Sequence, residues 1–91
     1  MLEAVDEGVT LRQTCREAVL DAFDQLKRQE GRDIFELWEI VEEVQQSTDK
    51  FAKTTIRTHV VSLMCVQAPA NHATRYADLD RVGHGLYRRR R

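Results

Sequence analysis

Proline, glycine, cysteine and long apolar runs are scarce in this sequence. Among 91 residues there are one proline, four glycines and two cysteines. The low proline and glycine content excludes collagen-like and low-complexity chains. No apolar run approaches the roughly 18 residues that a membrane-spanning helix needs, so we expect a soluble protein with no membrane partner. The widely separated Cys15 and Cys65 are expected to be small buried residues rather than a disulfide.

The length leaves room for one small domain with a modest core. Residues 10–91 are expected to form that domain, and residues 1–9, which lack periodicity, are expected to be a flexible lead-in. The acidic segment Met1–Glu7 has neither a basic leader nor an apolar stretch, which argues against a signal peptide and favours a cytoplasmic location.

An excess of either charge is also absent, since the formal net charge is −1. This average hides a strong polarity along the chain. Residues 1–46 carry 12 acidic and 5 basic side chains, a net charge of −7, whereas residues 47–91 carry 3 acidic and 9 basic ones, a net charge of +6. A basic back half that coincides with a candidate helix and hairpin suits a domain that presents one face to phosphates. A solvated charge distribution without function is the alternative.

Apolar residues at helical spacing predict the first helix between residues 11 and 30. Thr10 is its expected N-cap, with Gln13 as the partner in a capping box, and Gly31 is the expected stop. Residues 33–35 then suit a brief strand that pairs with a later hairpin. A second helix should follow at once.

In this second helix, Leu37, Ile40, Val41 and Val44 share one face. The other face is acidic and carries Glu36, Glu39, Glu42 and Glu43. An acidic face cannot lie on DNA. Trp38 falls just off the apolar stripe, where it should close the edge of the core; a partner surface is the alternative.

A third helix is expected over about residues 53–67, beginning near Lys53 or Thr54 and ending before Pro69. Thr54 is expected to cap it. Its buried stripe should contain Ile56, Val60, Leu63 or Met64, and Gln67. Outside the core this leaves mainly polar, hydrogen-bonding side chains: Thr55, Arg57, Thr58, His59 and Ser62.

A hairpin is predicted at the C-terminal end of the chain. Residues 79–82 and 86–89 are the candidate strands. Gly83-His84-Gly85 should form the tight connection because glycine readily adopts positive φ angles. Four arginines, residues 88–91, end the sequence.

Taken together, this order of elements resembles a winged helix-turn-helix domain over about residues 10–90. At the level of residues the chain resembles a small winged-helix family that is met in bacterial proteins and in association with restriction-type nucleases. The matching segments are residues 55–60, Met64-Cys65, Ala68-Pro69 with Asn71-His72-Ala73, and residues 78–88. The resemblance implies an α+β, mostly α fold: three helices, a short strand and a C-terminal β-hairpin wing.

The resemblance also implies that the third helix enters the major groove of double-stranded DNA. There Arg57 would bind a guanine, and Thr55, Thr58 and Ser62 would contact phosphates or a thymine methyl group. His59 is either a further contact or a partly buried residue that hydrogen-bonds across the domain. The residues expected on the DNA backbone or in an adjacent groove are Lys50, Lys53, Arg75, Arg81, His84 and Arg88.

The resulting expectation is a DNA-binding protein that regulates transcription or targets a larger defence or restriction assembly to DNA. A homodimer through the first helix is plausible. The alternative is a protein-interaction domain whose acidic second helix binds a basic partner. No enzymatic activity, cofactor or metal is expected, because Cys65 and His72 lack a second ligand pair and no nucleophile elbow or phosphate loop accompanies them.

Overall fold

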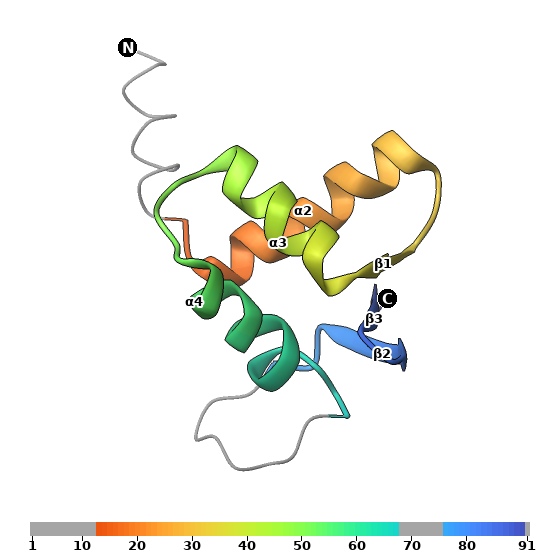
Figure 1. The fold of residues 1–91 in the computed structure, drawn as a ribbon. Helices are drawn as coiled ribbons and strands as arrows, with labels where there is room; N and C mark the ends of the chain where they lie inside the picture. The colour runs from red at the N-terminus through yellow and green to blue at the C-terminus, as the bar shows by residue number, and fades with distance from the viewer. Residues whose placement is uncertain (1–12, 68–75, 91) are drawn as a thin grey trace.

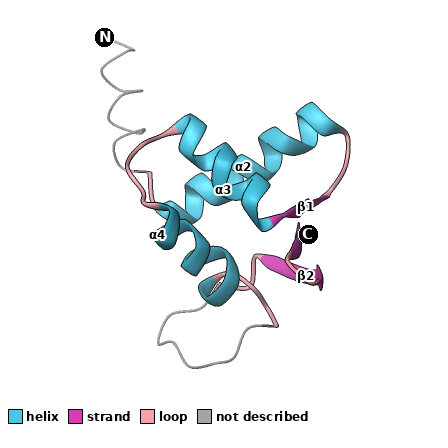
Figure 2. Cartoon of the chain, viewed as in Figure 1, coloured by secondary structure: helices cyan, strands magenta, loops and turns pink. Residues whose placement is uncertain are grey.

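The computed structural model describes residues 13–67 and 76–90 (Figure 1). These residues form a small α+β domain with three α-helices and one three-stranded antiparallel sheet (Figure 2). The expected α+β class is confirmed at this level. None of the helices in these two ranges is long and apolar enough to cross a membrane. The expected lead-in, the Thr10 cap and the stop at Pro69 lie outside the described residues.

Helix α2 spans Cys15–Glu30 and begins later than expected. Thr14 is the N-cap: its hydroxyl accepts the Glu17 N–H at 3.1 Å, and the Glu17 carboxylate accepts the Thr14 N–H at 2.9 Å. Gln13 lies before the helix, so the capping-box partner of α2 is Glu17 instead of the expected Gln13, and Glu17 supplies a charged acceptor at the N-terminal end of the helix dipole. Gly31 ends the helix as predicted, with φ 71°.

Strand β1 (Ile34–Glu36) continues directly into helix α3 (Leu37–Ser47). The strand was predicted one residue earlier. In α3 the predicted stripe is confirmed: Ile40, Val41 and Val44 are buried and Leu37 packs against the core. Trp38 does not close the core edge, because 59% of it is exposed. The placement of this residue in the core edge was therefore wrong.

Helix α4 covers only Lys53–Thr58, with Ala52 at the N-cap, so Thr54 does not cap the helix. A π-helical turn, η1 (His59–Leu63), follows, in which the Met64 N–H donates to the His59 carbonyl at 2.8 Å. The expected single helix to residue 67 is thus too long. The run His59-Val60-Val61-Ser62 explains the change, since β-branched residues, His and Ser are weak helix formers. Gln67, expected in the buried stripe, is exposed.

The sheet has the strand order β1-β3-β2. Strands β2 (Leu79–Gly83) and β3 (Leu86–Arg89) form the predicted hairpin, connected by His84-Gly85. Of the two hairpin glycines, only Gly85 takes a positive φ, 67°, because Gly83 belongs to the strand. The Gly85 carbonyl accepts the Leu37 N–H at 3.0 Å, so the tip of the hairpin lies against the start of α3.

The core lies between the three helices and the sheet. Its largest fully buried side chains are Phe35, Ile40, Ile56, Met64 and Leu79. Phe23 of α2 meets the Phe35 ring edge to face, with centroids 6.0 Å apart. Cys15 and Cys65 are both buried and neither is in a disulfide, as expected, and burial raises the pKa of Cys15. Cys65 is not helical, however; it forms a bridge with Leu79 at the start of the hairpin.

Candidate nucleic-acid interface

The outer side of α4 carries the polar residues expected there. Thr55, Arg57 and Thr58 are exposed, while Ile56 between them is fully buried. Lys53, at the start of the helix, is also exposed. Burial of the single apolar face fixes the rotation of the helix about its axis, and this rotation turns the other residues to solvent.

Many of the basic side chains are already paired within the domain. Arg89 of β3 contacts Asp24 of α2 at 2.6 Å, and Arg88 and Arg90 each approach Asp80 at 3.9 Å. The arginine run is therefore held partly by acids of the domain itself. Arg88, a predicted DNA contact, keeps a half-exposed side chain but faces a carboxylate.

Three cations on α4 and the hairpin lack such an acidic partner. In the described ranges, Lys53 and Arg57 have no ion-pair partner, and the Arg81 guanidinium reaches only the Gly83 carbonyl, at 3.4 Å. The backbone N–H of Arg81 donates to the side chain of Gln67 at 2.8 Å, which fixes its position on the strand. We call Lys53, Arg57 and Arg81 the cation surface.

Tyr87 lies within electrostatic reach of one arginine from the helix and one from the hairpin. Burial raises the pKa of this phenol, and the nearby Arg81 and Arg57 oppose the rise. Both guanidinium groups are thus close enough to act on one side chain. Tyr87 itself is only 4% exposed and packs in the core.

The remaining predicted contact residues differ from one another in exposure and in hydrogen bonding. His84 is exposed in the hairpin turn, and Ser62 is half-buried in η1. His59 Nδ1 lies 3.0 Å from the carbonyl of Thr55, so its hydrogen bond stays within the helix instead of crossing the domain. Lys50 Nζ donates to the Gln13 carbonyl at 3.3 Å. Arg75 lies outside the described residues.

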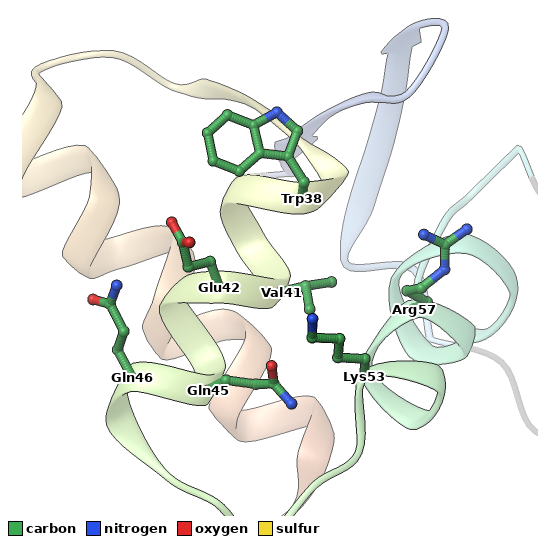
Figure 3. Close-up of a pocket in the computed structure, with 7 residues that line it drawn as sticks. All are labelled: Trp38, Val41, Glu42, Gln45, Gln46, Lys53 and Arg57. Carbon is green, nitrogen blue, oxygen red and sulfur yellow. The ribbon is translucent and has the colours of Figure 1, made fainter.

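A groove between α3 and α4 adjoins the cation surface and was missed by the sequence analysis (Figure 3). Its volume is about 500 Å³. Helix α3 contributes Trp38, Val41, Glu42, Gln45 and Gln46, and α4 contributes Lys53 and Arg57. The α3 residues follow a helical i, i+3, i+4, i+7, i+8 pattern, which defines a second face beside the buried stripe. That spacing, together with a tryptophan off the core stripe, is the feature of the sequence that could have indicated the groove.

Comparison with known proteins identifies a family for nearly the whole described domain. Residues 14–89 match the family described as domain of unknown function DUF7669. The chain belongs to this family. No curated protein and no solved structure matches the chain. The DUF7669 region extends from the N-cap of α2 to the last residue of β3, so it contains the cation surface and the α3–α4 groove.

Among residues 13–67 and 76–90 of this DUF7669 domain, no three His, Cys, Asp or Glu side chains gather as a candidate metal site. The cation surface, the outer side of α4 and the groove offer cationic, hydroxyl, amide and aromatic groups, together with the carboxylate of Glu42. Apart from the carboxylate, these groups bind anions and planar rings.

Proposed function

We propose that this chain is a winged helix-turn-helix domain that binds double-stranded DNA. The observation that carries the proposal is the cation surface: Lys53, Arg57 and Arg81 are exposed, and within the described residues none forms an ion pair with a carboxylate. Two of these side chains come from α4 and one from the hairpin. Unpaired cations on one helix and an adjacent ribbon are suited to phosphates and to guanine edges.

The arrangement of elements supports this assignment. Helices α3 and α4 are joined by residues 48–52, and a β-hairpin follows α4 in the chain (Figure 1). In a helix-turn-helix domain the second helix of the pair enters the major groove. Helix α4 would be that helix here, and β2–β3 would be the wing.

Individual side chains can be given roles in this complex. Arg57 would bind a guanine through its two parallel N–H groups, and Thr55 and Thr58 would contact phosphates or a thymine methyl group. Arg81 and His84 would contact the DNA backbone beside the wing. The wing should reach only a short way, because its tip is hydrogen-bonded to Leu37 at the start of α3.

The proposed protein acts by binding and carries out no reaction. It would regulate transcription, or direct a larger bacterial defence or restriction assembly to DNA. Either role requires affinity for duplex DNA, which is therefore the property to measure.

Fluorescence anisotropy of a labelled random-sequence duplex tests the proposal. We expect binding that weakens as salt rises, because each neutralised phosphate releases counterions. Arg57→Ala should weaken binding, whereas Arg28→Ala, which removes an exposed arginine of α2 whose guanidinium donates to Gln25, should not. Absence of binding by a folded protein at low salt would refute the proposal, as would equal losses in the two variants.

The exposed Trp38 favours one second candidate, a protein-binding domain that uses α3. The acidic face would supply the charge for a basic partner, although Glu39 is already bound by Arg32 at 2.6 Å. Charge reversal at Glu42, which is exposed beside Trp38, would then abolish partner binding. The same substitution should not weaken DNA binding if the first proposal is correct, because it removes a negative charge next to the cation surface.

A further inference from the structure

Trp38 is a large aromatic side chain that the fold leaves in solvent. It is 59% exposed, and no ring contact or cation contact to it occurs in the described part of the chain. It lines the α3–α4 groove together with Val41, which is only 7% exposed. Figure 3 shows Trp38 near the start of α3, with Lys53 and Arg57 on the facing helix. The Trp38 ring is thus open to solvent and available for stacking.

The polar groups of the groove narrow the choice of ligand. Lys53 and Arg57 supply positive charge, and Gln46 supplies an exposed amide. The Gln45 amide nitrogen donates to the Phe51 carbonyl at 3.5 Å, which orients this side chain at the groove wall. Glu42 is the one acid among the lining residues and can accept hydrogen bonds from hydroxyl or amino groups. A matching ligand has a planar ring, hydrogen-bonding edges and a phosphate.

We infer that the α3–α4 groove binds a nucleotide. The base stacks on Trp38, its edge meets the glutamine amides, and the phosphate lies between Lys53 and Arg57. Glu42 accepts from a ribose hydroxyl or an exocyclic amine. The groove volume of about 500 Å³ falls within the range typical of small-molecule sites. The nucleotide is either a free mononucleotide or one unstacked unit of a single strand, since both present the same chemistry.

Occupancy of the groove has a consequence for duplex binding. Lys53 and Arg57 line the groove and also belong to the cation surface, so a bound nucleotide and a duplex compete for the same two side chains. This competition rests on the proposed function, whereas nucleotide binding itself does not. The groove would therefore make DNA binding responsive to nucleotide concentration.

Trp38 makes the inference directly testable because it is the only tryptophan in the chain. Its fluorescence, excited at the red edge of its absorption, should fall saturably when adenosine monophosphate is added to the full chain. Adenosine or inorganic phosphate alone should bind more weakly. Arg57→Ala and Lys53→Ala should each weaken binding about tenfold or more, the usual cost of losing a charge-assisted hydrogen bond. Arg28→Ala is the matched control and should leave the titration unchanged.

Calorimetry measures nucleotide binding to a Trp38 variant, which no longer has the tryptophan fluorescence. Trp38→Leu should weaken adenosine monophosphate binding about tenfold, as expected for a lost base stack, while circular dichroism confirms that the variant is folded. The inference is overturned if the folded wild-type protein shows no saturable response, if Arg28→Ala loses as much affinity as Arg57→Ala, or if phosphate alone binds as tightly as the nucleotide.

Two further measurements distinguish a free nucleotide from a single strand as the ligand, and nucleotide binding from the proposed duplex binding. A single-stranded trinucleotide that binds more tightly than adenosine monophosphate supports the site and identifies a strand as the ligand; equal affinity supports it and identifies the free nucleotide. Nucleotide binding without duplex binding would retain the site and refute the proposed function. Duplex binding with no response to the nucleotide would retain the proposed function and refute the nucleotide site.

Discussion

Replacement of Arg16 by alanine should destabilise the whole domain. Arg16 lies in the first turn of α2, and Asp78 lies just before β2. The guanidinium donates twice to the carboxylate, from Nε at 2.7 Å and from the terminal nitrogen at 2.9 Å. It also lies 4.4 Å from the centroid of the Tyr76 ring. This contact joins residues 62 positions apart in the chain and anchors the hairpin to α2.

The magnitude follows from the burial of the two partners. The Asp78 side chain is only 14% exposed and would lose its charged partner, whereas the Arg16 side chain is 40% exposed, which lowers the value of the pair. Hydrogen bonds to charged groups contribute about 1.5–3 kcal/mol, so we expect a loss of about 2 kcal/mol. For a domain of this size that corresponds to a fall in Tm of about 8–16 °C.

Thermal unfolding followed by circular dichroism measures the loss. Arg28→Ala is the control and should change the free energy of unfolding by less than about 0.5 kcal/mol. The double substitution Arg16→Leu with Asp78→Leu should recover part of the loss, because no charge is then left unpaired. A single variant that unfolds within about 0.5 kcal/mol of wild type would show that the contact has no energetic weight and refute the reasoning.

Three other variants have definite expected outcomes. Although burial acts to raise the pKa of Glu39, the hydrogen bond from Arg32 and the Glu36 N–H hold it below its ordinary value. Its contribution to stability is therefore present above the unfolded pKa and lost as pH falls through the folded one, and Glu39→Gln should flatten the acid limb of a stability–pH curve. Gly85→Ala should cost about 1–2 kcal/mol in urea unfolding, because a φ of 67° strains any residue with a side chain. No clash adds to this cost, since no atom lies within 4 Å of the added Cβ; an unchanged midpoint would contradict the prediction. The raised pKa of Tyr87 should rise further in Arg57→Ala, since a nearby cation is removed. Ultraviolet titration in a Tyr76→Phe background measures this pKa. An unchanged pKa would show that Arg57 of α4 does not act on Tyr87 of the hairpin.

Periodicity predicted the parts of the fold in which burial alone decides the outcome. The stripe of Ile40, Val41 and Val44 is buried as expected, and the hairpin forms where alternation and glycine indicated it. Caps were harder to predict, because Thr10 and Thr14 each precede a suitable partner and the choice depends on which turn can pack. The end of α4 was also missed, since the π-helical turn brings Met64 into the core by a hydrogen bond that spacing does not encode.

The candidate site was harder to predict than the fold. The exposed residues of α4 could be predicted from the sequence, but the sequence did not distinguish basic residues that are paired with acids from those that are not. Pairing separates them, because Arg89 is bound to Asp24, 65 positions away, while Arg57 is not paired. The groove was missed because it needs two helices, and the spacing on α3 gains meaning only when Lys53 and Arg57 face it.

The hydrogen bond from Leu37 to Gly85 has a mechanical consequence. Strand β1 passes into α3 without a loop, and this bond ties the same junction to the hairpin tip. The sheet and α3 should therefore rotate as one stiff unit with little freedom to adapt on encounter. A preorganised chain loses little conformational entropy on association, but any change of shape needed for a close fit must then be made by the partner. Under the proposed function, a duplex that bends easily should then bind faster and more tightly than a stiff one of equal charge.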